Sequence, residues 1–94
     1  MPRISATIIA CNEANKIARA IRSLSCADEI VVVDSGSTDE TCSIAAGLGA
    51  RVIQEPWRGY AAQKNFATRQ AQHEWILSLD ADEELDAVIS EQAA

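Results

Sequence analysis

Four short runs of apolar and mostly β-branched residues alternate with segments of helical periodicity, and this alternation most constrains the fold. The runs are Ile4–Ala10, Ile30–Val33, Arg51–Gln54 and Trp75–Leu79. Short apolar runs of this kind are typical of buried parallel strands. Helices between such strands imply right-handed crossovers. The sequence therefore predicts an α/β fold of about four parallel strands with helices on both faces of the sheet.

Local signals predict where the helices begin and end. Asn12 follows the first strand and can cap the first helix. Ser37 and Glu40 have capping-box spacing, which predicts that the second helix begins at Ser37 and ends near Gly47 and Gly49. A third helix is expected over residues 61–72, and an acidic helix over residues 83–93 would complete a β-α-β-α-β-α-β-α order.

Length, charge and cysteine content limit the classes of function. A chain of 94 residues allows one domain, residues 1–94. Its net charge of −6 argues against nucleic-acid binding, which requires a basic face. Cys11, Cys26 and Cys42 are odd in number and lack metal-site spacing, so we interpret them as buried or half-buried thiols in a reducing compartment. No signal peptide or membrane-spanning run is evident, which favours a cytoplasmic location and leaves peripheral membrane contact open.

Polar groups follow the end of every predicted strand. They are Asn12-Glu13, Asp34, Glu55 and the pair Asp80 and Asp82. The carboxyl ends of parallel strands form the ligand-binding edge of such sheets. Carboxylates gathered at one edge would repel each other unless a cation or hydrogen-bond donors offset them. The Asp-x-Asp pair at residues 80–82 therefore predicts a divalent-cation site that can hold a diphosphate.

Each of these residues also has a purely structural interpretation. Asn12 and Glu13 can cap the first helix, and Asp34 can brace its turn through Asx-type hydrogen bonds. Lys64 and Asn65 can be solvated helix positions, and Asp82 can be an acid in the first turn of a helix. A nicotinamide cofactor is not expected, because the Gly-x-Gly-x-x-Gly pattern is absent from the sequence.

Four segments in this order resemble inverting family 2 nucleotide-sugar glycosyltransferases. They are Thr7–Glu13, Glu29–Thr41, Pro56–Ala67 and Trp75–Glu83, and together they extend over nearly the whole chain. The segment Pro56–Ala67 is similar to the subgroup of lipopolysaccharide-core β-1,4-glucosyltransferases. The resemblance implies the N-terminal, Rossmann-like half of a GT-A fold, which binds the donor nucleotide.

The resemblance also implies roles for individual residues. Those placed around the nucleotide sugar are Asn12, Glu13, Asp34, Ser37, Lys64, Asn65 and Asp80. Asp34 would bond the uracil or ribose, Lys64 would lie near the phosphates, and Asp80 would face the ribose and donor sugar. Asp82 would ligate the Mg²⁺ or Mn²⁺ ion that bridges the diphosphate. The implied donor is a UDP-sugar, with UDP-glucose favoured, and the implied acceptor is a lipid-linked or lipopolysaccharide-core glycan at the inner face of the cytoplasmic membrane.

Whole enzymes of this family are longer and carry the acceptor site and the general base in their second half. No catalytic residue is identified in this sequence, and we expect the base beyond Ala94. The chain would then be a donor-binding half, with an unpaired apolar edge along residues 75–79 through which it could self-associate. Two alternatives stay open: a non-catalytic nucleotide-binding module or pseudo-enzyme fragment, and a receiver-like signalling domain, which also gathers carboxylates at strand ends.

Overall fold

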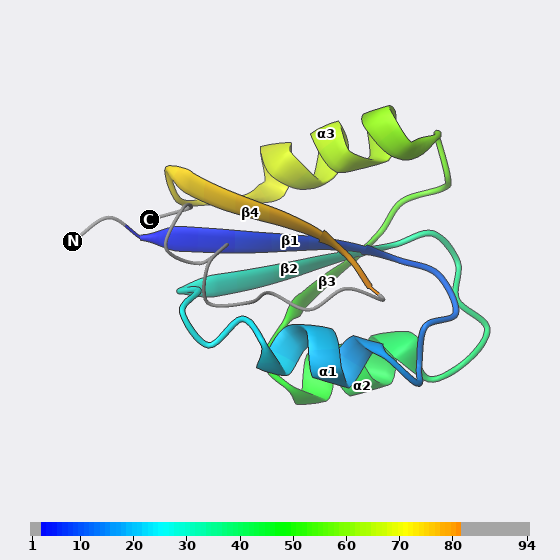
Figure 1. Cartoon of the computed structure of the whole chain (residues 1–94). Coiled ribbons are helices and arrows are strands. Elements are labelled where there is room, and N and C mark those ends of the chain that lie inside the picture. The colour runs from blue at the N-terminus through cyan, green and yellow to red at the C-terminus, as the bar shows by residue number, and fades with distance from the viewer. Residues whose placement is uncertain (1–2, 82–94) are drawn as a thin grey trace.

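The computed structural model describes residues 3–81 and contains a parallel sheet between two layers of helices (Figure 1). The elements in chain order are β1 (Ile4–Ala10), α1 (Ile17–Arg22), β2 (Glu29–Asp34), α2 (Thr41–Gly47), β3 (Arg51–Gln54), α3 (Tyr60–Gln70) and β4 (Trp75–Asp80). This arrangement confirms the predicted α/β fold and the four predicted strands. The acidic helix predicted over residues 83–93 lies outside the described residues.

The sheet has the strand order β3-β2-β1-β4, and every neighbouring pair is parallel. The chain moves outward from β1 to β2 and β3, and then returns to place β4 on the other side of β1. Figure 1 shows α1 and α2 on one face of the sheet and α3 on the other. The strand order therefore reverses between β1 and β4, and open α/β sheets bind ligands outside the carboxyl ends of the strands at such a point.

The central strand β1 is buried along its whole length, and its side chains alternate between two apolar cores. One core lies on the side of α1 and α2 and includes Ile8, Ile17 and Val32. A smaller core lies on the side of α3 and includes Ile9 and Ala67. Burial of β1 on both faces explains why its sequence is mostly apolar rather than alternating between apolar and exposed polar residues.

The predicted helix starts are wrong at α1 and α2. Helix α1 begins at Ile17 and helix α2 at Thr41, and neither has a side-chain cap from the residue preceding it. The Asn12 side chain and the Ser37 hydroxyl bond to other loop residues, described below, so they are not helix caps. Helix α3 runs from Tyr60 to Gln70, close to its expected range.

Two further observations concern exposure. Cys11 and Cys26 are exposed and only Cys42 is half-buried, so the expectation of sheltered thiols is wrong for Cys11 and Cys26.

Strand β4 lies at the edge of the described sheet, and Trp75 and Ile76 are 39% and 36% exposed. Self-association along this edge stays a prediction, which sedimentation velocity over a range of concentrations can check. Within residues 3–81, no helix has both the length and the apolar character to cross a bilayer.

Candidate functional site

The loop after β1 is bonded to the loop after β2, and Asn12 is the centre of this connection. The Asn12 side-chain oxygen accepts hydrogen bonds from the backbone N–H of Thr38 at 2.7 Å and of Asp39 at 3.3 Å. The Asn12 N–H donates to the Ser37 hydroxyl oxygen at 2.8 Å. Asn12 has a φ of +53°, a conformation that Asn tolerates better than most residues. Asn12 and Ser37 thus hold two strand-end loops together.

Two more bonds extend this connection toward α2. The Glu13 N–H donates to the Thr41 hydroxyl at 2.9 Å, and the Ala14 N–H donates to the Asp39 carboxylate at 3.2 Å. Asp39 in turn accepts from the N–H and the hydroxyl of Thr41. The hydroxyl and backbone N–H of Thr41 hold the pKa of the Asp39 carboxyl below its ordinary value. Asp39, rather than Ser37, therefore satisfies the first N–H of α2.

Asp34 is fully buried at the end of β2 and braces the turn that follows. Its carboxylate accepts from the N–H of Gly36 at 3.0 Å and of Ser37 at 2.8 Å, and from the Ser37 hydroxyl. Burial raises the pKa of this carboxyl, but hydrogen bonds from Ser37, Gly36 and Gln54 outweigh burial and leave the pKa lowered. The turn-bracing interpretation of Asp34 is confirmed, and its predicted bond to uracil or ribose stays a prediction.

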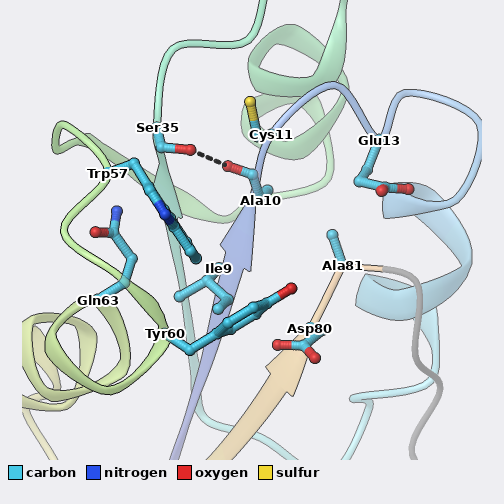
Figure 2. Close-up of a pocket in the computed structure, with 10 residues that line it drawn as sticks. All are labelled: Ile9, Ala10, Cys11, Glu13, Ser35, Trp57, Tyr60, Gln63, Asp80 and Ala81. Carbon is cyan, nitrogen blue, oxygen red and sulfur yellow. Dashed lines mark hydrogen bonds between the residues drawn. The ribbon is translucent and has the colours of Figure 1, made fainter.

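A pocket of about 400 Å³ opens at the carboxyl ends of β1 and β4, where the strand order reverses (Figure 2). Its lining residues are Ile9, Ala10, Cys11, Glu13, Ser35, Trp57, Tyr60, Gln63, Asp80 and Ala81. Of the residues predicted to bind the donor, Glu13 and Asp80 line this pocket. Asn12, Asp34 and Ser37 instead build the adjoining loops, and Asp82 lies outside the described residues.

Three of the strand-end carboxylates, those of Asp34, Glu55 and Asp80, have basic or hydrogen-bonding partners that offset their charge. Lys64 on α3 places its ammonium nitrogen 3.6 Å from a carboxylate oxygen of Asp80. Arg58 pairs with Glu55 at the end of β3. Lys64 is therefore a neighbour of the pocket rather than only a solvated helix position. Asn65 is exposed on α3 and lies outside the described lining of the pocket.

The sequence did not single out the loop between β3 and α3 as part of the site. Trp57 from this loop and Tyr60 at the start of α3 line the pocket, and their rings meet edge to face with centroids 5.0 Å apart. Gln63, fully buried on α3, also lines it. The available signal was the pair of aromatic residues around a glycine directly after a strand end. Nothing in the sequence indicated that Gln63 is buried, because a glutamine within a helix is usually exposed.

Residues 5–89 match the family described as Glycosyl transferase family 2. The chain belongs to this family. The match includes both strand-end loops, the aromatic loop and β4, so the pocket lies within the matched region. The family predicted from the sequence is thereby confirmed.

Individual relatives and structures agree with this membership. An uncharacterized glycosyltransferase of Rickettsia felis is 53% identical over 93 residues, covering 98% of this chain and 33% of the relative. The lipopolysaccharide core biosynthesis glycosyltransferase LpsC of Rhizobium meliloti is 46% identical, covering 94% of this chain and 34% of LpsC. The chain thus spans about a third of the length of the curated relatives that it matches.

Among solved structures, glucosyl-3-phosphoglycerate synthase of Mycobacterium tuberculosis matches this family 2 domain with a TM-score of 0.71. In its complex with Mn²⁺ and UDP-glucose the identity is 30%, and the match covers 86% of this chain and 33% of that chain. In its complex with Mn²⁺, UDP and glucosyl-3-phosphoglycerate the identity is 27%, and the match covers 88% and 36%. The four-stranded parallel sheet therefore matches the GT-A glycosyltransferase fold that the resemblance implied.

Proposed function

We propose that this chain binds a UDP-sugar, with UDP-glucose favoured, as the donor site of an inverting glycosyltransferase. The observation that carries the proposal is the pocket between the carboxyl ends of β1 and β4, with Asp80 in its wall, in a member of family 2. Parallel α/β sheets bind nucleotides at such a point. The Mycobacterium tuberculosis enzyme, which shares this fold, was solved with UDP-glucose and Mn²⁺.

The pocket residues fit a divalent cation shared with a diphosphate. Glu13 and Asp80 are hard oxygen donors in the pocket wall. Residues 3–81 hold no group of three candidate metal ligands, and Mg²⁺ at a substrate diphosphate needs only one or two carboxylates, because phosphates and water complete its coordination. Asp80, with Asp82 two residues later, would hold Mg²⁺ or Mn²⁺. Such an ion supplies Lewis-acid stabilisation of the charge that develops on the leaving diphosphate.

In this proposal, the other contacts to the UDP-sugar come from side chains on α3 and from the loops after β1 and β2. Lys64, 3.6 Å from Asp80, would place its positive charge near the phosphates. Asn65 would lie close by on α3. The loops fixed by Asn12, Asp34 and Ser37 would hold the nucleoside end at the carboxyl end of β2. Their cross-bonding supports the proposal, because a preformed site loses less entropy when it binds its ligand.

The acceptor in this proposal is a lipopolysaccharide-core or lipid-linked glycan of the cell envelope, which the similarity to LpsC supports. The reaction would then take place at the inner face of the cytoplasmic membrane. Inversion also requires a general base near the acceptor hydroxyl. The described residues are assigned to donor binding only, and a test for released UDP with acceptor added separates binding from transfer.

A thermal-shift titration of the 94-residue chain with UDP and Mn²⁺ tests the proposal. A ligand that binds only the folded state, at a concentration one hundred times its Kd, adds about 2.7 kcal/mol to the free energy of unfolding, which raises Tm by roughly 10–20 °C for a domain of this size. We expect UDP to raise Tm when Mn²⁺ is present, and Asp82→Ala to reduce the shift. Glu74→Gln, an exposed acid-to-amide change outside the pocket, serves as the control. An unchanged Tm at millimolar UDP and Mn²⁺ would contradict donor binding.

A further inference from the structure

Trp57 and Tyr60 are large aromatic side chains that stay exposed beside the pocket. They are 51% and 65% exposed, yet their rings keep an edge-to-face contact at an interplanar angle of 88°. Exposed aromatic side chains that are held in place beside a cavity are characteristic of ligand-binding surfaces. Both side chains project toward the pocket (Figure 2).

The loop that carries Trp57, between β3 and Tyr60 at the start of α3, is fixed by Gln63. The Gln63 side-chain oxygen accepts from the Arg58 N–H at 3.2 Å, and its side-chain nitrogen donates to the Glu55 carbonyl at 3.1 Å. Gln63 therefore bonds the loop on both sides of Trp57. Gly59 completes the turn into α3 with a φ of +95°, which a residue with a Cβ would adopt only with strain. The indole of Trp57 is thus positioned before any ligand arrives, which reduces the entropy lost on binding.

The two ends of the pocket differ in polarity. Asp80 and Tyr60 lie together at the end of β4, whereas Trp57 lies toward Ser35 at the end of β2 (Figure 2). A UDP-sugar has the same polarity, with a charged diphosphate and a sugar at one end and a neutral planar base at the other. If the diphosphate lies at Asp80, the base lies on the side of Trp57.

We propose that the Trp57 indole stacks on the uracil base of the donor and that Gln63 is the positioning residue for this contact. The proposal rests on the proposed function, because it presumes that UDP enters this pocket. It adds a contact that the sequence motifs did not assign. Stacking of a base on an aromatic side chain is worth enough that its loss lowers affinity roughly 5- to 150-fold.

Intrinsic fluorescence tests the contact directly, because the chain has two tryptophans at opposite ends of the sheet. Trp75 begins β4, about 16 Å along the strand from Asp80. In Trp75→Phe only Trp57 emits, and we expect UDP with Mn²⁺ to quench its fluorescence. In Trp57→Phe only Trp75 emits, and we expect no change. Quenching in Trp57→Phe but not in Trp75→Phe would overturn the stacking proposal.

Calorimetric titration of Trp57→Ala separates the base from the sugar and from the diphosphate. With Mn²⁺ present, we expect a similar loss of affinity for UDP and for UDP-glucose, and no loss for pyrophosphate, which lacks the base. A loss confined to UDP-glucose would assign Trp57 to the sugar and overturn the proposal. UDP binding that is unchanged in Trp57→Ala would overturn the stacking contact and leave the proposed function intact. No UDP binding to the wild type would overturn both.

Discussion

At the scale of single residues, the polar side chains that the sequence offers as ligand contacts are bonded mainly to one another. Asn12 accepts from Thr38 and Asp39, and Asp34 accepts from Gly36 and Ser37. A side chain can stabilise a loop and still present another atom to a ligand. The structural and functional interpretations of these residues are therefore compatible, and mutations at Asn12 or Asp34 must be tested for stability before any loss of binding is assigned to contact.

Asn12 offers a test of its two structural contributions, the side-chain hydrogen bonds and the tolerance of a φ of +53°. Asn12→Gly removes the hydrogen bonds but accepts this φ, so we expect it to lower the free energy of unfolding by about 1 kcal/mol. Asn12→Ala adds backbone strain, so we expect a further loss of about 1 kcal/mol. Urea unfolding measures both.

Asn15 provides the matched control for this pair. It is an exposed asparagine three residues later in the same loop. We expect Asn15→Ala to change the free energy of unfolding by less than about 0.5 kcal/mol. If Asn12→Ala were as stable as Asn12→Gly, the φ of Asn12 would not constrain the choice of residue.

At the scale of secondary structure, the strands and the start of α3 were predictable from the sequence, whereas the starts of α1 and α2 were not. The four strands lie within one residue of their expected ranges, because each is a short apolar run bounded by polar residues and buried in the sheet. The helix starts depend on which partner each capping side chain selects. Ser37 has capping-box spacing with Glu40, yet its hydroxyl donates to Asp34. Sequence spacing alone does not reveal which of these two partners the Ser37 side chain selects. Ser37 therefore does not cap α2, whose first N–H, that of Thr41, donates to Asp39 instead.

Only part of the candidate site was predictable from the sequence. Strand-end residues such as Glu13 and Asp80 follow from topology, because parallel strands bring their carboxyl ends to one edge. The position of Trp57 in the pocket wall does not follow from topology, because Trp57 reaches the pocket only through the path of its loop. That path depends on Gln63, whose partners are backbone atoms of the loop and leave no sequence pattern.

The two hydrogen bonds from Gln63 to the loop that carries Trp57 form what we call the Gln63 clamp. The clamp can be tested in Trp75→Phe, where the emission reports on Trp57 alone. Adding Gln63→Ala leaves the Arg58 N–H and the Glu55 carbonyl without their side-chain partner. We expect greater quenching of Trp57 by acrylamide, because the loop is less fixed, and a loss of about 1–3 kcal/mol in the free energy of unfolding. Gln70→Ala, at the end of the same helix, is the control. Acrylamide quenching that is equal in the two variants would argue against the clamp.

At the scale of the whole molecule, Glu29 connects several elements at the end of the sheet opposite the pocket. Its carboxylate accepts from the Ser5 hydroxyl at 2.7 Å, from the Gln72 N–H at 2.9 Å, and from the Arg51 guanidinium at 3.3 Å. These partners come from β1, the segment after α3, and β3. A single side chain on β2 thus links β1, β3 and the segment between α3 and β4, while Asp34 braces the turn at the other end of the same strand.

These two carboxylates predict how stability depends on pH. Burial raises the pKa of Glu29, but the hydrogen bonds from Gln72, Ser5 and Arg51 outweigh it, and the pKa lies below its usual value of 4.5. The pKa of Asp34 is likewise lowered from 3.8, as its turn hydrogen bonds outweigh burial. A group with a lowered pKa in the folded state stabilises it above the usual pKa, and this stabilisation is lost as the pH falls through the folded-state value. We therefore expect the free energy of unfolding, measured with urea, to fall as the pH drops below about 4.5.

Glu29→Gln should lower stability at neutral pH and make this acid dependence shallower, whereas the exposed control Glu74→Gln should leave it unchanged. An acid dependence in Glu29→Gln as steep as that of the wild type would show that the carboxylate of Glu29 does not stabilise the sheet.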